Sequence, residues 1–68
     1  MTAKEMFEKL GYRYMRLLSN KEHIWYRHTK RKSEIVFNLI GKSISNDYAI
    51  KLEELQAINK QVEELGWK

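Results

Sequence analysis

The sequence contains no cysteine, so it can form neither a disulfide nor a thiolate site. It also lacks any run of about 18 apolar residues, the length that a membrane-spanning helix requires. Its first residues, Met1 to Met6, lack the uninterrupted apolar core of a signal peptide. We therefore expect a cytoplasmic protein without a membrane partner.

Patterns that carry catalysis or metal binding are missing as well. Gly41-Lys42-Ser43 looks like the end of a phosphate-binding loop, but Val36 stands where that motif requires a glycine. The only histidines, His23 and His28, have an odd spacing that directs them to opposite faces of one strand, so they are poor joint ligands. We expect both to be ordinary residues on the surface of a strand.

Neighbouring carboxylates occur twice, as Glu53-Glu54 and as Glu63-Glu64. Adjacent residues of a helix diverge by about 100°, so neither pair can act as an acid/base dyad, and we expect solvated helix faces. None of the serines lies in a Gly-x-Ser-x-Gly elbow. The sequence therefore predicts no enzyme, no catalytic or metal-binding residue, no cofactor and no small-molecule substrate.

Only three glycines are present, and two of them follow helix-like segments. Leu10-Gly11-Tyr12 and Leu65-Gly66-Trp67 are typical of a helix stopped by a left-handed glycine, with an aromatic residue that folds back onto the last turn. Thr2 and Glu5 have the spacing of a capping box at the start of the first helix. The second helix carries an apolar stripe of Leu52, Leu55, Ile58, Val62 and Leu65.

Between these helices the pattern changes to that of strands. Two antiparallel strands are predicted over Tyr12 to Leu18 and His23 to Thr29, and a central one over Glu34 to Ile40 because both of its faces are apolar. Gly41-Lys42 indicates a tight turn into a short strand around Ile44. At 68 residues the chain is one small domain, residues 1–68, of modest stability. We predict an α+β fold: helix, three- or four-stranded antiparallel meander, helix, with both helices on one face of the sheet.

If both helices cover one face, the other face is open. Strand alternation places one set of side chains together on the first face: Ile24, Tyr26, Ile35, Phe37 and Leu39. The candidates for the open face mix large apolar and basic side chains: Arg13, Met15, Leu17, Trp25, Arg27, Val36, Asn38 and Ile40. A face of that composition is typical of an interaction site. Two alternatives remain, namely helices on both faces or a register that is wrong by one residue.

The formal net charge of +4 is unevenly distributed. Tyr12 to Ser33 has an excess of six positive charges, whereas the last segment, Leu52 to Lys68, is mildly acidic. Such asymmetry favours a polyanionic partner, although surface charge also keeps a small protein in solution.

We predict a non-catalytic interaction module that binds a protein partner, or a second copy of itself as a homodimer, through the open sheet face. The alternative is nucleic-acid binding, in which the basic strand and hairpin contact phosphates while Trp25 stacks on unpaired bases. The candidate interaction residues are Arg13, Met15, Trp25, Arg27, Lys30, Arg31 and Lys32. The cluster from Lys30 to Lys32 could equally serve only to keep an exposed hairpin from aggregating.

The two ends of the chain also carry a resemblance. Thr2 to Tyr12 and Glu54 to Trp67 resemble the two ends of small uncharacterised proteins from prophages and mobile elements of Gram-positive bacteria. The resemblance covers about 25 residues and implies a bacterial or phage cytoplasmic protein with the helix, sheet, helix layout. It implies no activity and no site residues. Those relatives tend to have acidic middle segments and a threonine where Lys51 stands, so the basic middle segment of this chain departs from their pattern.

Overall fold

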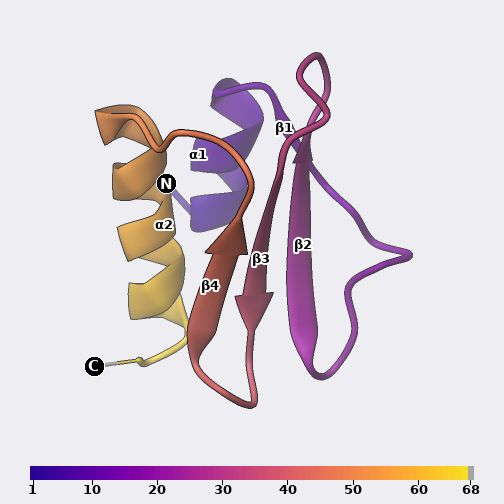
Figure 1. The fold of residues 1–68 in the computed structure, drawn as a ribbon. Coiled ribbons are helices and arrows are strands. Elements are labelled where there is room, and N and C mark those ends of the chain that lie inside the picture. The colour runs from indigo at the N-terminus through magenta and orange to yellow at the C-terminus, as the bar shows by residue number, and fades with distance from the viewer. Residues whose placement is uncertain (68) are drawn as a thin grey trace.

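A computed structural model describes residues 1–67. Its elements follow the predicted α+β order, with four strands (Figure 1): α1 (Ala3–Lys9), β1 (Tyr12–Tyr14), β2 (His23–His28), β3 (Glu34–Asn38), β4 (Ser43–Asn46) and α2 (Leu52–Glu64). The strands form one antiparallel sheet in the order β1-β2-β3-β4, so that β2 and β3 are its inner strands. Neither helix has the length and the apolar character that crossing a bilayer would require in the part of the chain that is described.

α1 begins at the predicted capping box, and both helices end at the predicted glycine stops. The Thr2 side chain accepts a hydrogen bond from the Glu5 backbone N–H, and the Glu5 carboxylate accepts one in return from the Thr2 N–H at 2.8 Å. Gly11 and Gly66 follow α1 and α2 in left-handed conformations, with φ of 94° and 74°. After Gly66, the Trp67 N–H donates to the Val62 carbonyl at 3.1 Å. The predicted helix stops are therefore confirmed.

The strands are shorter than the sequence predicts. β1 ends at Tyr14, because residues 16–18 form a turn in which the Leu18 N–H donates to the Met15 carbonyl. Leu17 is consequently 96% exposed at the tip of the β1–β2 loop and does not lie on the sheet. β3 ends at Asn38, whose side-chain carbonyl accepts hydrogen bonds from two following backbone N–H groups, so Ile40 lies in a turn as well.

One face of the sheet packs on both helices, and it is the predicted one. Tyr26 pairs with Ile35 and Ile24 with Phe37, so alternation directs these four side chains to the same side. The Phe7 ring of α1 stacks on the ring of Tyr26 with 4.1 Å between centroids. Tyr26, Phe7, Phe37 and Ile35 are the largest fully buried side chains. The core therefore lies between this face and the helices.

The buried side of α2 differs from the predicted stripe. Leu52 and Leu55 are 67% and 45% exposed, whereas the residues that α2 buries are Glu54, Ala57, Ile58 and Gln61. Two of these are polar, and each has a partner: the Gln61 side-chain carbonyl accepts a hydrogen bond from the Tyr26 hydroxyl at 2.7 Å, and Glu54 binds groups of the sheet. The predicted stripe is confirmed in its C-terminal part, because Ile58 is buried and Val62 and Leu65 pack against the core. At the start of α2 the partnered Glu54 is buried instead, at little cost, and Leu52 and Leu55 are left exposed.

Candidate interaction surface

On the helix side, a polar cluster joins α2 to the sheet and the β2–β3 hairpin. The Glu54 carboxylate accepts hydrogen bonds from the Tyr12 hydroxyl at 2.7 Å and from the Arg31 guanidinium at 2.8 Å. The Arg31 guanidinium also lies 4.4 Å from the centroid of the Tyr48 ring. Glu54 is only 4% exposed, so the expectation that it lies on a solvated helix face is wrong. The Lys51 backbone N–H also donates to this carboxylate, at 2.9 Å, and the three hydrogen bonds together offset the cost of burying the charge.

This cluster shifts the pKa values of its members. Burial disfavours the charged form of Glu54, but the hydrogen bonds from the Lys51 backbone N–H, Tyr12 and Arg31 outweigh burial and lower the pKa of the carboxyl below its ordinary value of 4.5. Burial and the adjacent Glu54 raise the pKa of the Tyr12 hydroxyl to about 12. The hydrogen bond to Glu54 likewise raises the pKa of Arg31. Glu54 and Arg31 are therefore charged, and Tyr12 neutral, at neutral pH.

His28 is not a surface residue either. It is 8% exposed, and its Nδ1 accepts hydrogen bonds from the backbone N–H groups of Lys30 and Arg31, both at 3.2 Å. Its ring meets the Tyr12 ring edge to face, with 5.1 Å between centroids. The buried side chain of His28 thus stabilises the hairpin, since it accepts hydrogen bonds from two backbone N–H groups that have no partner in the strand ladder.

The hairpin therefore divides the basic cluster that the sequence predicts as one unit. Arg31 turns to the helix side and binds Glu54, so it is not available on the open face. Lys30 is exposed in the loop. Lys32 has a φ of 62°, a left-handed conformation that is uncommon for a lysine, and it lines a hollow on the opposite face. Of the three cations, only Lys32 contributes to that hollow.

The open face is the side of the sheet that neither helix covers. At its centre Trp25 of β2 lies directly opposite Val36 of β3, and both are half-buried. Next to this pair, Arg27 lies opposite Glu34, and the Arg27 Nε donates to the Glu34 carboxylate at 2.8 Å. Arg13, Met15, Trp25, Arg27 and Val36 thus lie on the side predicted from alternation, and Glu34 and Lys32 lie on it as well.

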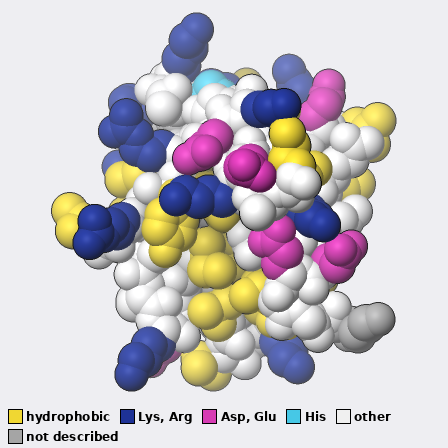
Figure 2. Space-filling view, turned by 180° about the vertical axis from the view of Figure 1, so that it is seen from behind, with side chains coloured by type: hydrophobic (Ala, Val, Ile, Leu, Met, Phe, Trp, Pro, Cys, Tyr) yellow, Lys and Arg dark blue, Asp and Glu magenta, His cyan; other side chains and the backbone are white. Residues whose placement is uncertain are grey.

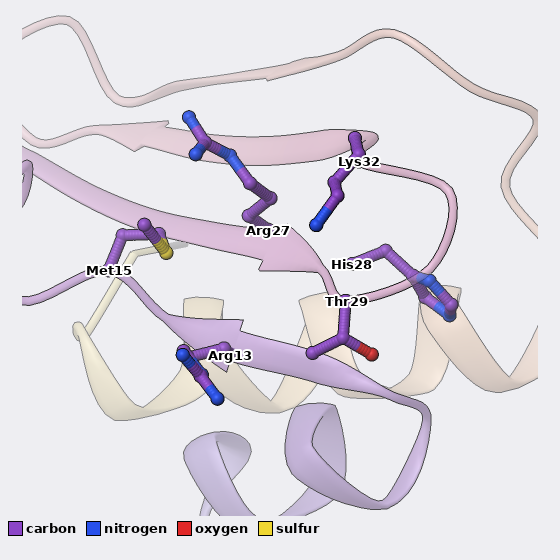
Figure 3. Close-up of a pocket in the computed structure, with 6 residues that line it drawn as sticks. All are labelled: Arg13, Met15, Arg27, His28, Thr29 and Lys32. Atoms are coloured by element: carbon purple, nitrogen blue, oxygen red, sulfur yellow. The ribbon is translucent and has the colours of Figure 1, made fainter.

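A cationic hollow of about 260 Å³ lies over β1 and β2 at one end of the open face. Its lining residues are Arg13, Met15, Arg27, His28, Thr29 and Lys32 (Figure 3). Arg13 and Arg27 are directly opposite each other on β1 and β2, yet their side chains extend in different directions (Figure 3). The amine of Lys32 reaches back from the hairpin toward β2. The positive groups are thus spread along the sheet and do not converge on one point.

A second hollow, of about 340 Å³, lies beside the first and runs over β2, β3 and β4. We call it the aromatic hollow, because the Trp25 ring and Val36 supply its large apolar surface. Its other lining residues are polar: His23, Glu34, Asn38, Ser45, Asn46 and Asp47. The Arg27–Glu34 ion pair lies between the two hollows, since Arg27 lines one and Glu34 the other.

Charge also divides between the two sides of the molecule. Residues 11–50, which form the sheet and its loops, carry eight Lys and Arg but only three Asp and Glu. The remaining residues, which include both helices, carry five and six. The view from behind shows carboxylates over the middle and one side, and mainly Lys and Arg along the opposite margin (Figure 2). The excess positive charge therefore belongs to the sheet segment.

Sequence reasoning missed some of the residues around these hollows. Alternation from Val36 would have placed Glu34 on the open face, and alternation from Trp25 would have placed His23 there. Thr29 and Asp47 lie just beyond strand ends, so their positions depend on turns that carry no periodic signal.

No protein-family model, no curated protein and no solved structure matches this chain. The resemblance of its two ends to prophage proteins therefore stays a prediction. Within residues 1–67, no group of three or more histidine or acidic side chains is placed to hold a metal ion.

Proposed function

We propose that the protein is a non-catalytic interaction module whose working surface is the open sheet face. The observation that carries this proposal is the arrangement of layers: both helices pack on one face and leave Trp25, Val36 and Met15 half-buried on the other. Soluble domains seldom leave large apolar side chains grouped on one face without a partner. Trp25 and Arg27 both lie on this face, and tryptophan and arginine are among the residue types most enriched in interface hot spots.

A binding role rather than catalysis is supported by the location of the perturbed groups. Active sites often contain groups with strongly shifted pKa values, and these groups lie in a cleft. Here Tyr12, Glu54 and Arg31 belong to the cluster that joins α2 to the sheet, where Glu54 and Arg31 hold each other in an ion pair beside a hollow of about 220 Å³. The shift at Glu5 comes from the capping box of α1. None of these shifted groups lines the cationic or the aromatic hollow.

The sequence favours a protein partner, including a second copy of the chain, with nucleic acid as the alternative. Sedimentation equilibrium over a range of protein concentrations, with and without a labelled single-stranded oligonucleotide, tests both partners. We expect Trp25→Ala to weaken whichever association occurs while the circular dichroism spectrum stays that of the wild type.

Leu55→Ala is the matched control, because Leu55 is a half-exposed apolar side chain on α2. An association that Leu55→Ala weakens and Trp25→Ala leaves unchanged would place the working surface on the helices and contradict the proposal. A chain that stays monomeric and leaves the oligonucleotide free would contradict both a second copy and nucleic acid as partners.

A further inference from the structure

We infer that the open face binds single-stranded nucleic acid, with phosphates along the cationic hollow and a base against Trp25 in the aromatic hollow. This inference rests on the proposed function and names the partner. Proteins that bind single strands combine a positively charged groove for the backbone with aromatic side chains on which bases stack. Both parts are present here as neighbouring hollows.

The first step concerns the distribution of charge within the face. Within the described residues 1–67, neither Arg13 nor Lys32 forms an ion pair, whereas Arg27 is held by Glu34. The cations extend along the sheet and do not surround one point (Figure 3). A single small anion would be held best by converging donors, while a chain of phosphates matches cations that are spread out. The geometry therefore favours an extended polyanion.

The second step concerns the neighbouring aromatic hollow. Trp25 and Val36 give it an apolar wall, and Asn38, Ser45 and Asn46 supply amide and hydroxyl groups around that wall. A nucleobase needs the same combination, a surface to stack on and donors and acceptors for its polar edge. A fully paired duplex would hide its bases from Trp25, so the hollow favours a single strand.

The third step is that the cationic hollow is built at a cost to the fold. Arg13 lies directly opposite Arg27 in the sheet, and like charges in that position destabilise it. Lys32 holds a left-handed backbone conformation that only glycine adopts freely. Lys42, in the β3–β4 turn outside both hollows, has a similar φ of 53°, so the cost that is specific to the cationic hollow is the pair Arg13 and Arg27. Local costs of this kind are typical of functional sites.

The charge of the face separates nucleic acid from a second copy of the chain. In a two-fold dimer the same face meets itself, so Arg13 and Lys32, which form no ion pair within residues 1–67, would face a surface of the same positive character. Phosphates complement these cations instead. The face, about 15 Å along its strands, accommodates a few nucleotides.

Fluorescence anisotropy of labelled dT12 and rU12, titrated with the protein between 25 and 200 mM NaCl, tests the inference and distinguishes DNA from RNA. We expect the logarithm of the association constant to fall linearly with the logarithm of the salt concentration. Two or three phosphate contacts would give a slope between about −1.4 and −2. Trp25→Ala should weaken binding by about tenfold or more, because stacking on the aromatic ring is lost.

Arg13→Glu is the sharpest variant, because it exchanges a repulsion with Arg27 for an attraction. We expect the melting temperature to stay the same or rise while binding weakens by at least tenfold. Lys60→Glu changes the net charge equally but lies on α2, and it should weaken binding by less than twofold. Equal losses for the two variants would show attraction to overall charge alone and would overturn the inference.

Failure of this inference can be told apart from failure of the proposed function. If neither oligonucleotide binds at 25 mM NaCl, the inference is wrong. Sedimentation that then reveals a self-association weakened by Trp25→Ala would leave the interaction module standing with a second copy as its partner. Absence of both would overturn the inference and exclude a second copy, and only a protein of another sequence would then remain as partner for the open face.

Discussion

The two faces of the sheet come from the same strands but differ in how their charged groups are paired: on the open face only Arg27 has an ion-pair partner among the described residues, Glu34. On the helix side, Glu54 and the hydroxyls of Tyr12 and Tyr26 all have partners within the chain. On the open face, Arg13 and Lys32 form no ion pair within residues 1–67, and Arg13 even lies opposite another arginine. The contrast teaches that position in the fold, and not residue type, decides whether a charge stabilises the protein. Arg31 and Lys32 are adjacent in the sequence and fall on different sides of this division.

The largest expected effect compares two neighbours on β2. Tyr26 is 2% exposed and contacts Phe7, whereas Trp25 is half-buried on the open face. We expect Tyr26→Ala to lower the free energy of unfolding by about 3 to 5 kcal/mol, which is comparable with the whole stability of so small a domain. Trp25→Ala should cost about 1 kcal/mol, because less surface leaves contact. Urea denaturation measures both, and equal losses would mean that the open face is also part of the core.

Next in size is the replacement of a buried partner. Glu54→Gln leaves Arg31 and the Tyr12 hydroxyl without their carboxylate, and we expect a loss of about 2 to 3 kcal/mol in the free energy of unfolding. Glu53→Gln, at the adjacent exposed position, is the control and should change stability by less than about 0.5 kcal/mol. Thermal unfolding of the two variants compares them. If Glu54→Gln leaves the melting temperature unchanged, the cluster does not hold α2 to the sheet.

The same cluster predicts how stability depends on pH. The pKa of Glu54 is lowered in the folded protein, so its contribution is complete above the ordinary value of 4.5 and is lost as the pH falls through the lower folded pKa. The pKa of Tyr12 is raised to about 12, so its contribution is complete below pH 10 and is lost between pH 10 and 12. Unfolding followed by circular dichroism from pH 3 to 12 measures both limbs. The acid limb should flatten in Glu54→Gln, and an unchanged limb would assign it to other carboxylates.

The smallest effect has the opposite sign. Lys32→Gly replaces a lysine at a φ of 62° by the residue that adopts this conformation freely, and we expect a gain of about 0.5 to 1 kcal/mol in the free energy of unfolding. The same change removes a cation from the open face and should weaken oligonucleotide binding. A variant that is both less stable and unchanged in binding would show that Lys32 neither costs stability nor contributes to the open face.

Much of the fold could be predicted because its signals are local. The capping box at Thr2, the glycines after each helix and the alternation along β2 and β3 depend only on residues a few positions apart. The orientation of α2 could not be predicted in this way. The burial of Glu54 and Gln61 depends on Tyr12, Arg31 and Tyr26, which are distant in sequence. The stripe alone therefore predicted the burial of Ile58 but not the exposure of Leu52 and Leu55.

The candidate surface was predicted in part for the same reason. Alternation identified Arg13, Trp25 and Arg27, because strand geometry alone determines their side of the sheet. Loop residues carry no such rule. The separation of Arg31 from Lys32 follows from a hairpin that His28 organises through its ring nitrogen, and a histidine in that role has no distinctive spacing in the sequence.

One hydrogen bond connects the two helices directly. The N–H of Ala3, in the first turn of α1, donates to the Glu64 carboxylate in the last turn of α2 at 2.8 Å, across 61 positions of sequence. A helix of seven residues is too short to persist alone in water, so α1 depends on this contact and on the burial of Phe7. The strands, in contrast, pair only with their neighbours in sequence through short loops. We therefore expect the sheet to assemble from local hairpins during folding, and the docking of the two helices, which closes the longest loop, to have the larger entropic cost.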